Sequence, residues 1–185
     1  MKAIKKPLFA LLLIGALYLE SCGPMPVRLP ELPLAEAQPY FNEVTEVQAI
    51  DTAFYQVMDA EGRLLGTLLL SAPFSNHVNG YNGPTPLLIV LDTEGRIQNV
   101  VLRDNQETPR FAQKVEQSGL YKAWDGLTVE EALGKQVDAI SGATYTSEAV
   151  KNSLKVRLEI YQRQLQKDHS ASKNLWQRLF TPKRR

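Results

Sequence analysis

The stretch Asp59-Ala60-Glu61-Gly62-Arg63 and its near-copy Asp92-Thr93-Glu94-Gly95-Arg96 decide the fold, because each separates two apolar runs. Glycine supplies the positive backbone angle that a tight hairpin turn often needs. Each D-x-E-G-R stretch is therefore predicted to turn one strand back on another, which gives two antiparallel hairpins. The four strands are expected at residues 55–58, 64–70, 87–91 and 97–102.

Helical patterns follow the second hairpin. Pro109 suits a first helical position, and Thr108 before it can act as the cap. A further short turn is expected at Glu130–Leu133, and apolar residues recur at helical spacing over 146–167. The last pattern predicts an amphipathic helix that packs on the sheet. The expected fold is a single α+β domain, an antiparallel sheet built from two hairpins and packed by helices.

Residues 1–21 are predicted to be a targeting signal. Three lysines precede an apolar run of twelve residues, Leu8–Leu19, which is shorter than the roughly twenty residues that a membrane-crossing helix needs. Leu19-Glu20-Ser21-Cys22 resembles a bacterial lipoprotein cleavage box, so Cys22 is the expected lipidation site. The alternative is an uncleaved signal anchor. Either way, the bulk of the chain is expected outside the cytoplasmic membrane, on the periplasmic side of the inner membrane or as an outer-membrane lipoprotein.

The remaining chain divides into three parts by composition. Residues 22–39 hold five prolines and are predicted to form a tether. The folded domain is expected at 40–167, with a short helix at the start of 40–53. Residues 168–185 form a basic tail in which Leu175, Trp176, Leu179 and Phe180 alternate with basic residues. That tail fits either a short helix on an anionic membrane or a frayed end.

Composition excludes several classes of function. Lys and Arg number 21 against 20 Asp and Glu, so the overall charge indicates no nucleic-acid partner. Cys22 is the only cysteine, which leaves no internal disulfide and no cysteine-based metal site. His77 and His169 lack the spacing of metal ligands, so no metal site is expected.

The stretch Asp138-Ala139-Ile140-Ser141-Gly142-Ala143-Thr144 is where chemistry is expected. Gly142 and Ala143 remove steric bulk beside the Thr144 hydroxyl, and the start of the next helix offers unpaired N–H groups that suit a phosphate. Thr144 is thus a candidate for an ester bond to a phosphate. The alternative is that Ser141, Thr144, Thr146 and Ser147 are ordinary cap and turn residues.

Two other loops share the character of a binding site. Gly80-Tyr81-Asn82-Gly83 lies within residues 73–86, a connection long enough to suggest a function. Its glycines allow close approach to a flat ligand, and Tyr81 could lie against a ring. Glu107-Thr108-Pro109 is the second loop, with Arg110 after it. The alternatives are a plain Asn-Gly loop and a helix cap preceded by an acid.

Together these motifs resemble those of a known family. The string D-x-x-S-G-A-T, supported by G-Y-N-G and E-T-P, is similar to the FMN-binding domains of the C subunit of sodium-translocating NADH:quinone reductase and the G subunit of Rnf-type electron-transport complexes. The resemblance covers residues 40–166, which makes 40–167 the expected FMN-binding domain. Arg110 stands where the family has glycine, and its guanidinium could lie near the flavin edge. The weaker match Trp124-Asp125-Gly126 is expected to place Trp124 in the core.

The resemblance implies roles for individual residues. Thr144 would hold FMN through a phosphoester bond made by a flavin transferase, and Asp138 would help to define the transferase's target. The remaining cofactor-binding residues that it implies are Ser141, Gly142, Ala143 and Thr146 around the ester and Gly80, Tyr81, Gly83, Glu107 and Thr108 along the flavin.

The expected function is electron transfer outside the cytoplasm through covalently held FMN, as a carrier or a subunit of a membrane-associated redox complex and not as a complete enzyme. The expected partners are the transferase, the other redox subunits and the membrane, reached through the lipid anchor. Two alternatives remain: a module of the same fold that binds or senses flavin without a covalent bond, and a lipoprotein with a structural role only.

Overall fold

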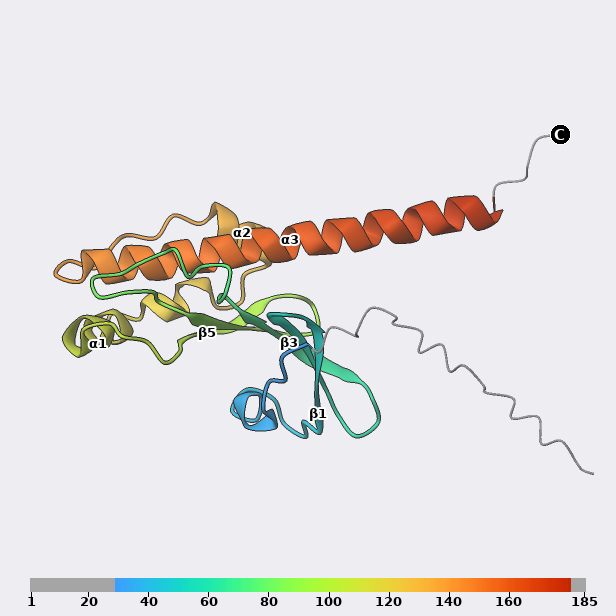
Figure 1. Cartoon of the computed structure of the whole chain (residues 1–185), viewed down its shortest axis with the longest axis horizontal. Helices are drawn as coiled ribbons and strands as arrows, with labels where there is room; N and C mark the ends of the chain where they lie inside the picture. Colours follow the sequence, from blue (N-terminus) through green and yellow to red (C-terminus); the bar gives the residue numbers. More distant parts are fainter. Residues whose placement is uncertain (1–28, 181–185) are drawn as a thin grey trace, which may run out of the picture.

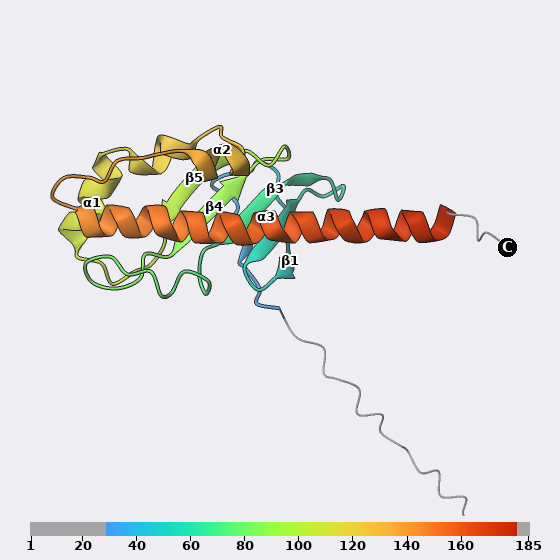
Figure 2. The same ribbon diagram turned by 90° about the horizontal axis from the view of Figure 1, so that it is seen from above.

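The computed structural model describes residues 29–180. The predicted signal, Cys22 and the first part of the predicted tether lie outside the described residues. Within them, one antiparallel sheet carries helices α2 and α3 on one face, and α1 lies at the end of the sheet near the start of α3, as Figure 1 shows. Seen from above in Figure 2, α3 crosses the strands and continues beyond the sheet. The fold is therefore α+β, as predicted.

The sheet has five strands in the order β1-β2-β3-β4-β5, and every neighbouring pair is antiparallel. Both predicted hairpins are confirmed, as β2–β3 and β4–β5. The short helix expected at the start of 40–53 is wrong, because that segment forms a turn and then an additional edge strand, β1. The strands are β1 Glu46–Asp51, β2 Phe54–Met58, β3 Leu64–Leu70, β4 Leu87–Leu91 and β5 Ile97–Leu102.

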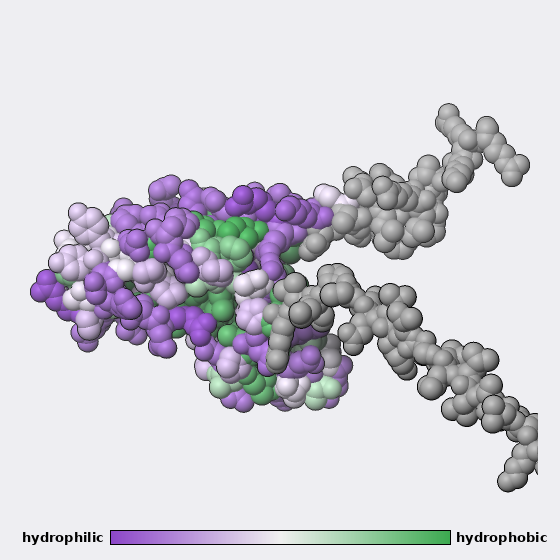
Figure 3. Space-filling model, in the orientation of Figure 1, coloured by the Kyte–Doolittle hydropathy of each residue, from purple (hydrophilic) through white to green (hydrophobic). Residues whose placement is uncertain are grey.

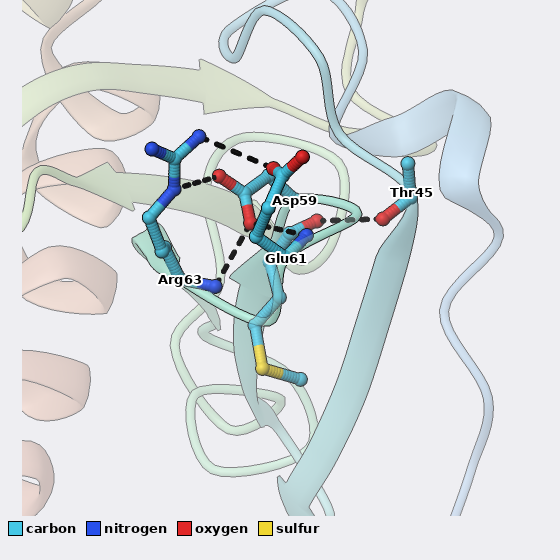
Figure 4. A network of polar contacts seen from close by, with 5 residues as sticks. Thr45, Asp59, Glu61 and Arg63 are labelled. Carbon is cyan, nitrogen blue, oxygen red and sulfur yellow. Dashed lines mark hydrogen bonds and ion pairs between the residues drawn. The ribbon is translucent and has the colours of Figure 1, made fainter.

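The two D-x-E-G-R turns fold in the same way. Asp59 Oδ1 accepts hydrogen bonds from the backbone N–H of Glu61 at 3.0 Å and of Arg63 at 2.8 Å (Figure 4). Asp92 Oδ1 accepts the equivalent pair from Glu94 and Arg96, each at 2.9 Å. The glycines at the fourth position have φ values of 74° and 77°. The aspartate and the glycine of the motif thus fix the turn, which explains why the pattern predicted it.

The helices differ from the prediction mainly at their ends. Thr108 precedes α1 as predicted, but its side chain forms no cap hydrogen bond. The predicted short turn is α2, which Thr128 and Glu131 begin with a capping box. The last helix begins at Thr144, not at 146, and runs past Lys167 to Phe180. The helices are α1 Pro109–Gln117, α2 Val129–Gly134 and α3 Thr144–Phe180, with 3-10 helices η1 Leu34–Glu36 and η2 Leu120–Trp124.

Apolar residues cover both faces of the sheet. The helical face packs β-strand residues such as Leu87 and Ile89 against Val150, Leu154 and Leu158 of α3. The other face is covered by the segment that contains η1, which lies on the opposite side of the sheet from α3 (blue in Figure 1). In Figure 3 hydrophilic residues cover most of the surface, and apolar residues show between the layer of α3 and the layer below it.

The predicted tether is shorter than expected. Leu32 and Ala37 are buried, and they pack in one cluster with Phe41 and Tyr55. These apolar side chains therefore cover part of the apolar face of the sheet that is opposite α3. The folded part of the chain thus begins before residue 40.

Buried polar contacts fasten α3 to the β1–β2 corner. The fully buried Arg157 donates from Nη2 to the carbonyl oxygen of Ala53 at 3.0 Å, and burial lowers its pKa to about 10. Gln164 Nε2 donates to Asp51 Oδ2 at 2.6 Å. Across the described range, no helix is long and apolar enough to cross a membrane.

Candidate functional site

The loop before α3 is held in one conformation by a serine of the helix itself. Ser147 Oγ accepts from the Ile140 N–H at 2.9 Å and donates to the Thr144 carbonyl oxygen at 3.0 Å. The Ala143 N–H donates to the Ile140 oxygen at 2.9 Å, and Gly142 has a φ of 74°. These bonds leave Thr144 as the exposed first residue of α3. Thr144 is therefore accessible to an outside reagent.

The helix start favours a negative charge at the same place. The first N–H groups of a helix have no partner within it, and they form the positive end of the helix dipole. Only the fourth amide of α3, that of Ser147, reaches back to the loop, to the Ala143 oxygen at 2.9 Å. A phosphate bonded to Thr144 would lie beside the remaining amides.

A cavity of about 270 Å³ opens beside Thr144. Tyr81 and Phe111 form one side of it, with ring centroids 4.8 Å apart and an interplanar angle of 68°. Residues 142–146 form the other side. Tyr81 is 62% exposed and Tyr145 is 73% exposed, so two aromatic side chains at one opening lack the burial that large rings usually have. Their surfaces can take a flat aromatic ligand.

The buried carboxylate of Glu107 joins the segments that form this cavity. Its Oε2 accepts from the Tyr81 N–H at 2.8 Å and from Thr146 Oγ1 at 3.0 Å. Its Oε1 accepts from the N–H groups of Asn82 at 3.0 Å and Thr108 at 2.9 Å. One side chain thus connects the 80–83 loop, the start of α1 and the first turn of α3.

Gly80 is required by the same carboxylate. A Cβ atom at this position would collide with Glu107 Oε2. The loop closes on itself through the bond from Gly80 N–H to the Gly83 oxygen at 2.7 Å. The loop can therefore approach Glu107 closely enough to place Tyr81 at the cavity.

The structure brings most of the predicted site residues together, in two layers. Tyr81, Gly142, Ala143, Thr144 and Thr146 line the cavity. Gly80, Gly83, Glu107 and Thr108 lie in the supporting segments behind it and are not among the lining residues. Asp138 and Ser141 are exposed on the segment that leads to Thr144. Trp124 is buried in the core, as predicted.

Three residues near the cavity were not among the predicted site residues. Phe111 lies in the helix predicted after Thr108 and belongs to none of the motifs, yet it lines the cavity. Tyr145 carried no signal beyond its place next to Thr144. Lys114 reaches the Gly142 backbone from α1, a proximity that only the tertiary arrangement creates. The guanidinium carbon of Arg110 lies 4.6 Å from the centroid of the Phe111 ring.

These features fit FMN in its two chemical parts. The aromatic walls suit the flavin ring, and the Thr144 hydroxyl at a helix start suits the phosphate. Between residues 29 and 180 there is no group of three His, Cys, Asp or Glu side chains placed to hold a metal ion.

Comparison with known proteins gives a family match over the same region. Residues 80–159 match the model of the FMN-binding domain family. The chain is 35% identical over 143 residues to the G subunit of the ion-translocating oxidoreductase complex of Stutzerimonas stutzeri, an alignment that covers 71% of this chain and 58% of that protein. It is 32% identical over 104 residues to the protein of the same name from Shewanella piezotolerans, covering 50% and 49%.

The chain thus spans about half the length of these relatives. Among solved structures, the crystal structure of Shewanella oneidensis NqrC aligns with a TM-score of 0.40 and 19% identity, over 57% of this chain and 54% of that one. The family match begins at the Gly80 loop and includes Glu107, Thr144 and most of the part of α3 that packs on the sheet.

Proposed function

This chain belongs to the FMN-binding domain family and its cofactor is FMN, and from that premise we propose that it transfers electrons through FMN bound covalently to Thr144. When bound, FMN supplies a ring that takes up and gives back electrons. The protein's part is to orient that ring, limit its contact with water and leave one edge accessible to partners.

The observation that most supports a covalent bond is the position of the Thr144 hydroxyl. Thr144 is exposed and is the first residue of α3. It lines the same cavity as Tyr81, Phe111 and Tyr145. Attachment joins Thr144 Oγ to the phosphorus of the flavin phosphate and gives a phosphodiester, while the bond from that phosphorus to the activating group breaks and the leaving group takes up the hydroxyl proton. A flavin transferase acting on an activated flavin nucleotide would make this bond, with Asp138 on the exposed approach as part of its target.

The relatives suggest the setting in which the electrons move. Both carry the name of a subunit of an ion-translocating oxidoreductase complex. We propose that this chain is likewise an FMN-bearing subunit or carrier in a membrane-associated redox complex, outside the cytoplasm and anchored by a lipid on Cys22. Replacing Cys22 with Ser should release the protein from the membrane fraction of cells, and retention there would contradict lipid anchoring.

Intact mass measurement tests the covalent bond directly. The full chain is produced together with a flavin transferase, and its mass should increase by that of FMN minus water. Peptide mapping should place the increment on Thr144, and Thr144→Ala should lack both the increment and fluorescence on a denaturing gel. A yellow native protein whose colour is lost on denaturation would instead indicate a non-covalent flavin module. An unmodified, colourless protein would leave a lipoprotein with a structural role only as the remaining hypothesis.

A further inference from the structure

We infer that Lys114 binds the phosphate group of the flavin nucleotide, an inference that rests on the proposed site at Thr144. Lys114 lies in the last turn of α1 and is exposed. A Cβ atom built on Gly142 would lie 2.5 Å from Lys114 Nζ and 3.6 Å from its Cε. The ammonium group therefore lies directly over the backbone of the loop, two residues before Thr144.

The backbone at Gly142 makes this approach possible. Its φ of 74° is a conformation that side-chain-bearing residues rarely adopt, and the space where a side chain would lie is filled by Lys114. The glycine of the S-G-A-T string thus has two functions: it turns the loop, and it admits a cation from a neighbouring helix.

Lys114 has no anionic partner within the described part of the chain. The ion pairs there join Arg63, Arg96, Arg103 and Lys151 to acidic residues, and none includes Lys114. Nor does its ammonium group form a hydrogen bond to any described residue. A cation held beside the positive end of a helix without a counter-charge is unfavourable, and an added phosphate would relieve this.

The plain alternative is that Lys114 serves the C-terminal end of its own helix. That end is already provided with hydrogen bonds, however. The Lys114 carbonyl oxygen accepts from Ser118 N–H at 3.1 Å, and the Glu116 oxygen accepts from Gly119 N–H at 3.0 Å. Ser118 Oγ donates to the Val115 oxygen at 2.6 Å. The lysine side chain is thus not needed to cap α1.

A phosphate at Thr144 would meet two kinds of donor. The amides at the start of α3 give directed hydrogen bonds, and the ammonium of Lys114 gives a compact charge with three donors. This charge would attract the dianionic phosphate of free FMN, and it would also attract the single negative charge of the phosphodiester.

The test compares FMN with riboflavin, which has the same ring but no phosphate. The full chain with Thr144→Val cannot be esterified, so binding of both ligands can be followed by quenching of flavin fluorescence. FMN should bind more tightly than riboflavin. Adding Lys114→Met should reduce that preference about two- to fivefold, the range for an exposed ion pair, with riboflavin binding unchanged.

Three comparisons make the result specific. Lys114→Arg should keep most of the preference for FMN, and Lys122→Met, which removes the same charge from an exposed position of η2, should not change it. Raising the salt concentration should lower the preference in the Lys114 chain and leave Lys114→Met nearly unaffected. Thermal unfolding of each ligand-free variant shows whether the fold is kept.

The outcomes separate the two proposals. An FMN increment on Thr144 together with an undiminished FMN preference in Lys114→Met would overturn the role of Lys114 and leave the proposed function. Equal binding of FMN and riboflavin with Lys114 present, or no binding of either, also overturns it. A chain that is never flavinylated and never binds FMN overturns both.

Discussion

At the residue scale, Glu107 has the greatest influence on the site although it does not line the cavity. It is 5% exposed and accepts four hydrogen bonds from three segments that are distant in the sequence. A buried carboxylate with this many donors holds loops in place more firmly than apolar contacts would, because breaking the arrangement leaves several polar groups unpaired. The cavity beside Thr144 is therefore formed before any ligand arrives.

Glu107→Ala should lower the free energy of unfolding by about 2–3 kcal/mol, since it leaves buried donors such as Thr146 Oγ1 unpaired. Urea unfolding measures this, and flavin affinity should fall in parallel as the 80–83 loop loosens. Glu116→Ala, which removes an exposed acid from α1, the helix that follows Glu107, is the matched control. Equal stability of the two variants would show that Glu107 does not hold the site together.

At the scale of elements, the first hairpin turn depends on Asp59 and should give stability a dependence on pH. Burial alone would raise the pKa of Asp59, but hydrogen bonds from Arg63 and Glu61 outweigh it and hold the pKa below its ordinary value. An aspartate with a lowered pKa in the folded state stabilises the protein above its unfolded pKa, near 4. That contribution is lost as the pH falls through the folded value.

Asp59→Asn should therefore be less stable than the parent chain at pH 7, and the difference should shrink steadily below about pH 4. Urea midpoints measured between pH 7 and pH 2.5 give the comparison. Asp104→Asn, at an exposed position, controls for the change in net charge. A difference that stays constant over the whole pH range would contradict the role given to the Asp59 carboxylate.

The elements also show what sequence can and cannot predict. Both hairpins were predictable because an aspartate and a glycine fix each turn locally, as Asp59 and Gly62 do. Strand β1 was not, because its residues alternate between exposed and half-buried, and a strand so weakly buried has a weak apolar pattern. The packing of Leu32 and Ala37 was not predictable either, because they lie in a proline-rich segment without an apolar pattern. Only the folded sheet provides the face, opposite α3, on which those side chains pack.

The residues of the candidate site also fall into two groups, those that the sequence predicts and those that only the fold brings to the cavity. Tyr81, Gly142 and Thr144 belong to short motifs, so the sequence indicated them. Phe111 and Lys114 come from α1, which only the tertiary fold brings against the loop before α3. Local motifs thus predicted the loops, and packing between helices supplied the rest of the cavity.

At the scale of the whole molecule, α3 is much longer than its contact with the sheet. Its last described side-chain hydrogen bond to a strand is that of Gln164 to Asp51, and beyond this point Leu165, Gln166 and Lys167 are exposed. Figures 1 and 2 both show the helix running on past β1. The helix therefore continues without a break past residue 167, the expected end of the domain, to Phe180.

A chain that stops after Lys167 should unfold with the same free energy as the full chain, within about 0.5 kcal/mol, because it keeps the contacts of Tyr161 and Gln164 with the strands and ends within the exposed residues 165–167. A chain that stops after Ile160 also loses Tyr161 and Gln164, and with them the edge contact to Phe54 and the bond to Asp51. It should be far less stable. Calorimetry of the two truncated proteins measures the difference. A large loss of stability in the protein that ends at Lys167 would mean that the part of the helix beyond it packs on the domain.

The uninterrupted course of α3 has a mechanical consequence. From Thr144 to Phe180 it is one rod, about 55 Å long at 1.5 Å per residue. A partner that binds the last turns of this helix would therefore also fix the orientation of the cavity at its first turn. The two ends of α3 thus lie far apart, so a partner could bind at Phe180 without blocking the cavity beside Thr144.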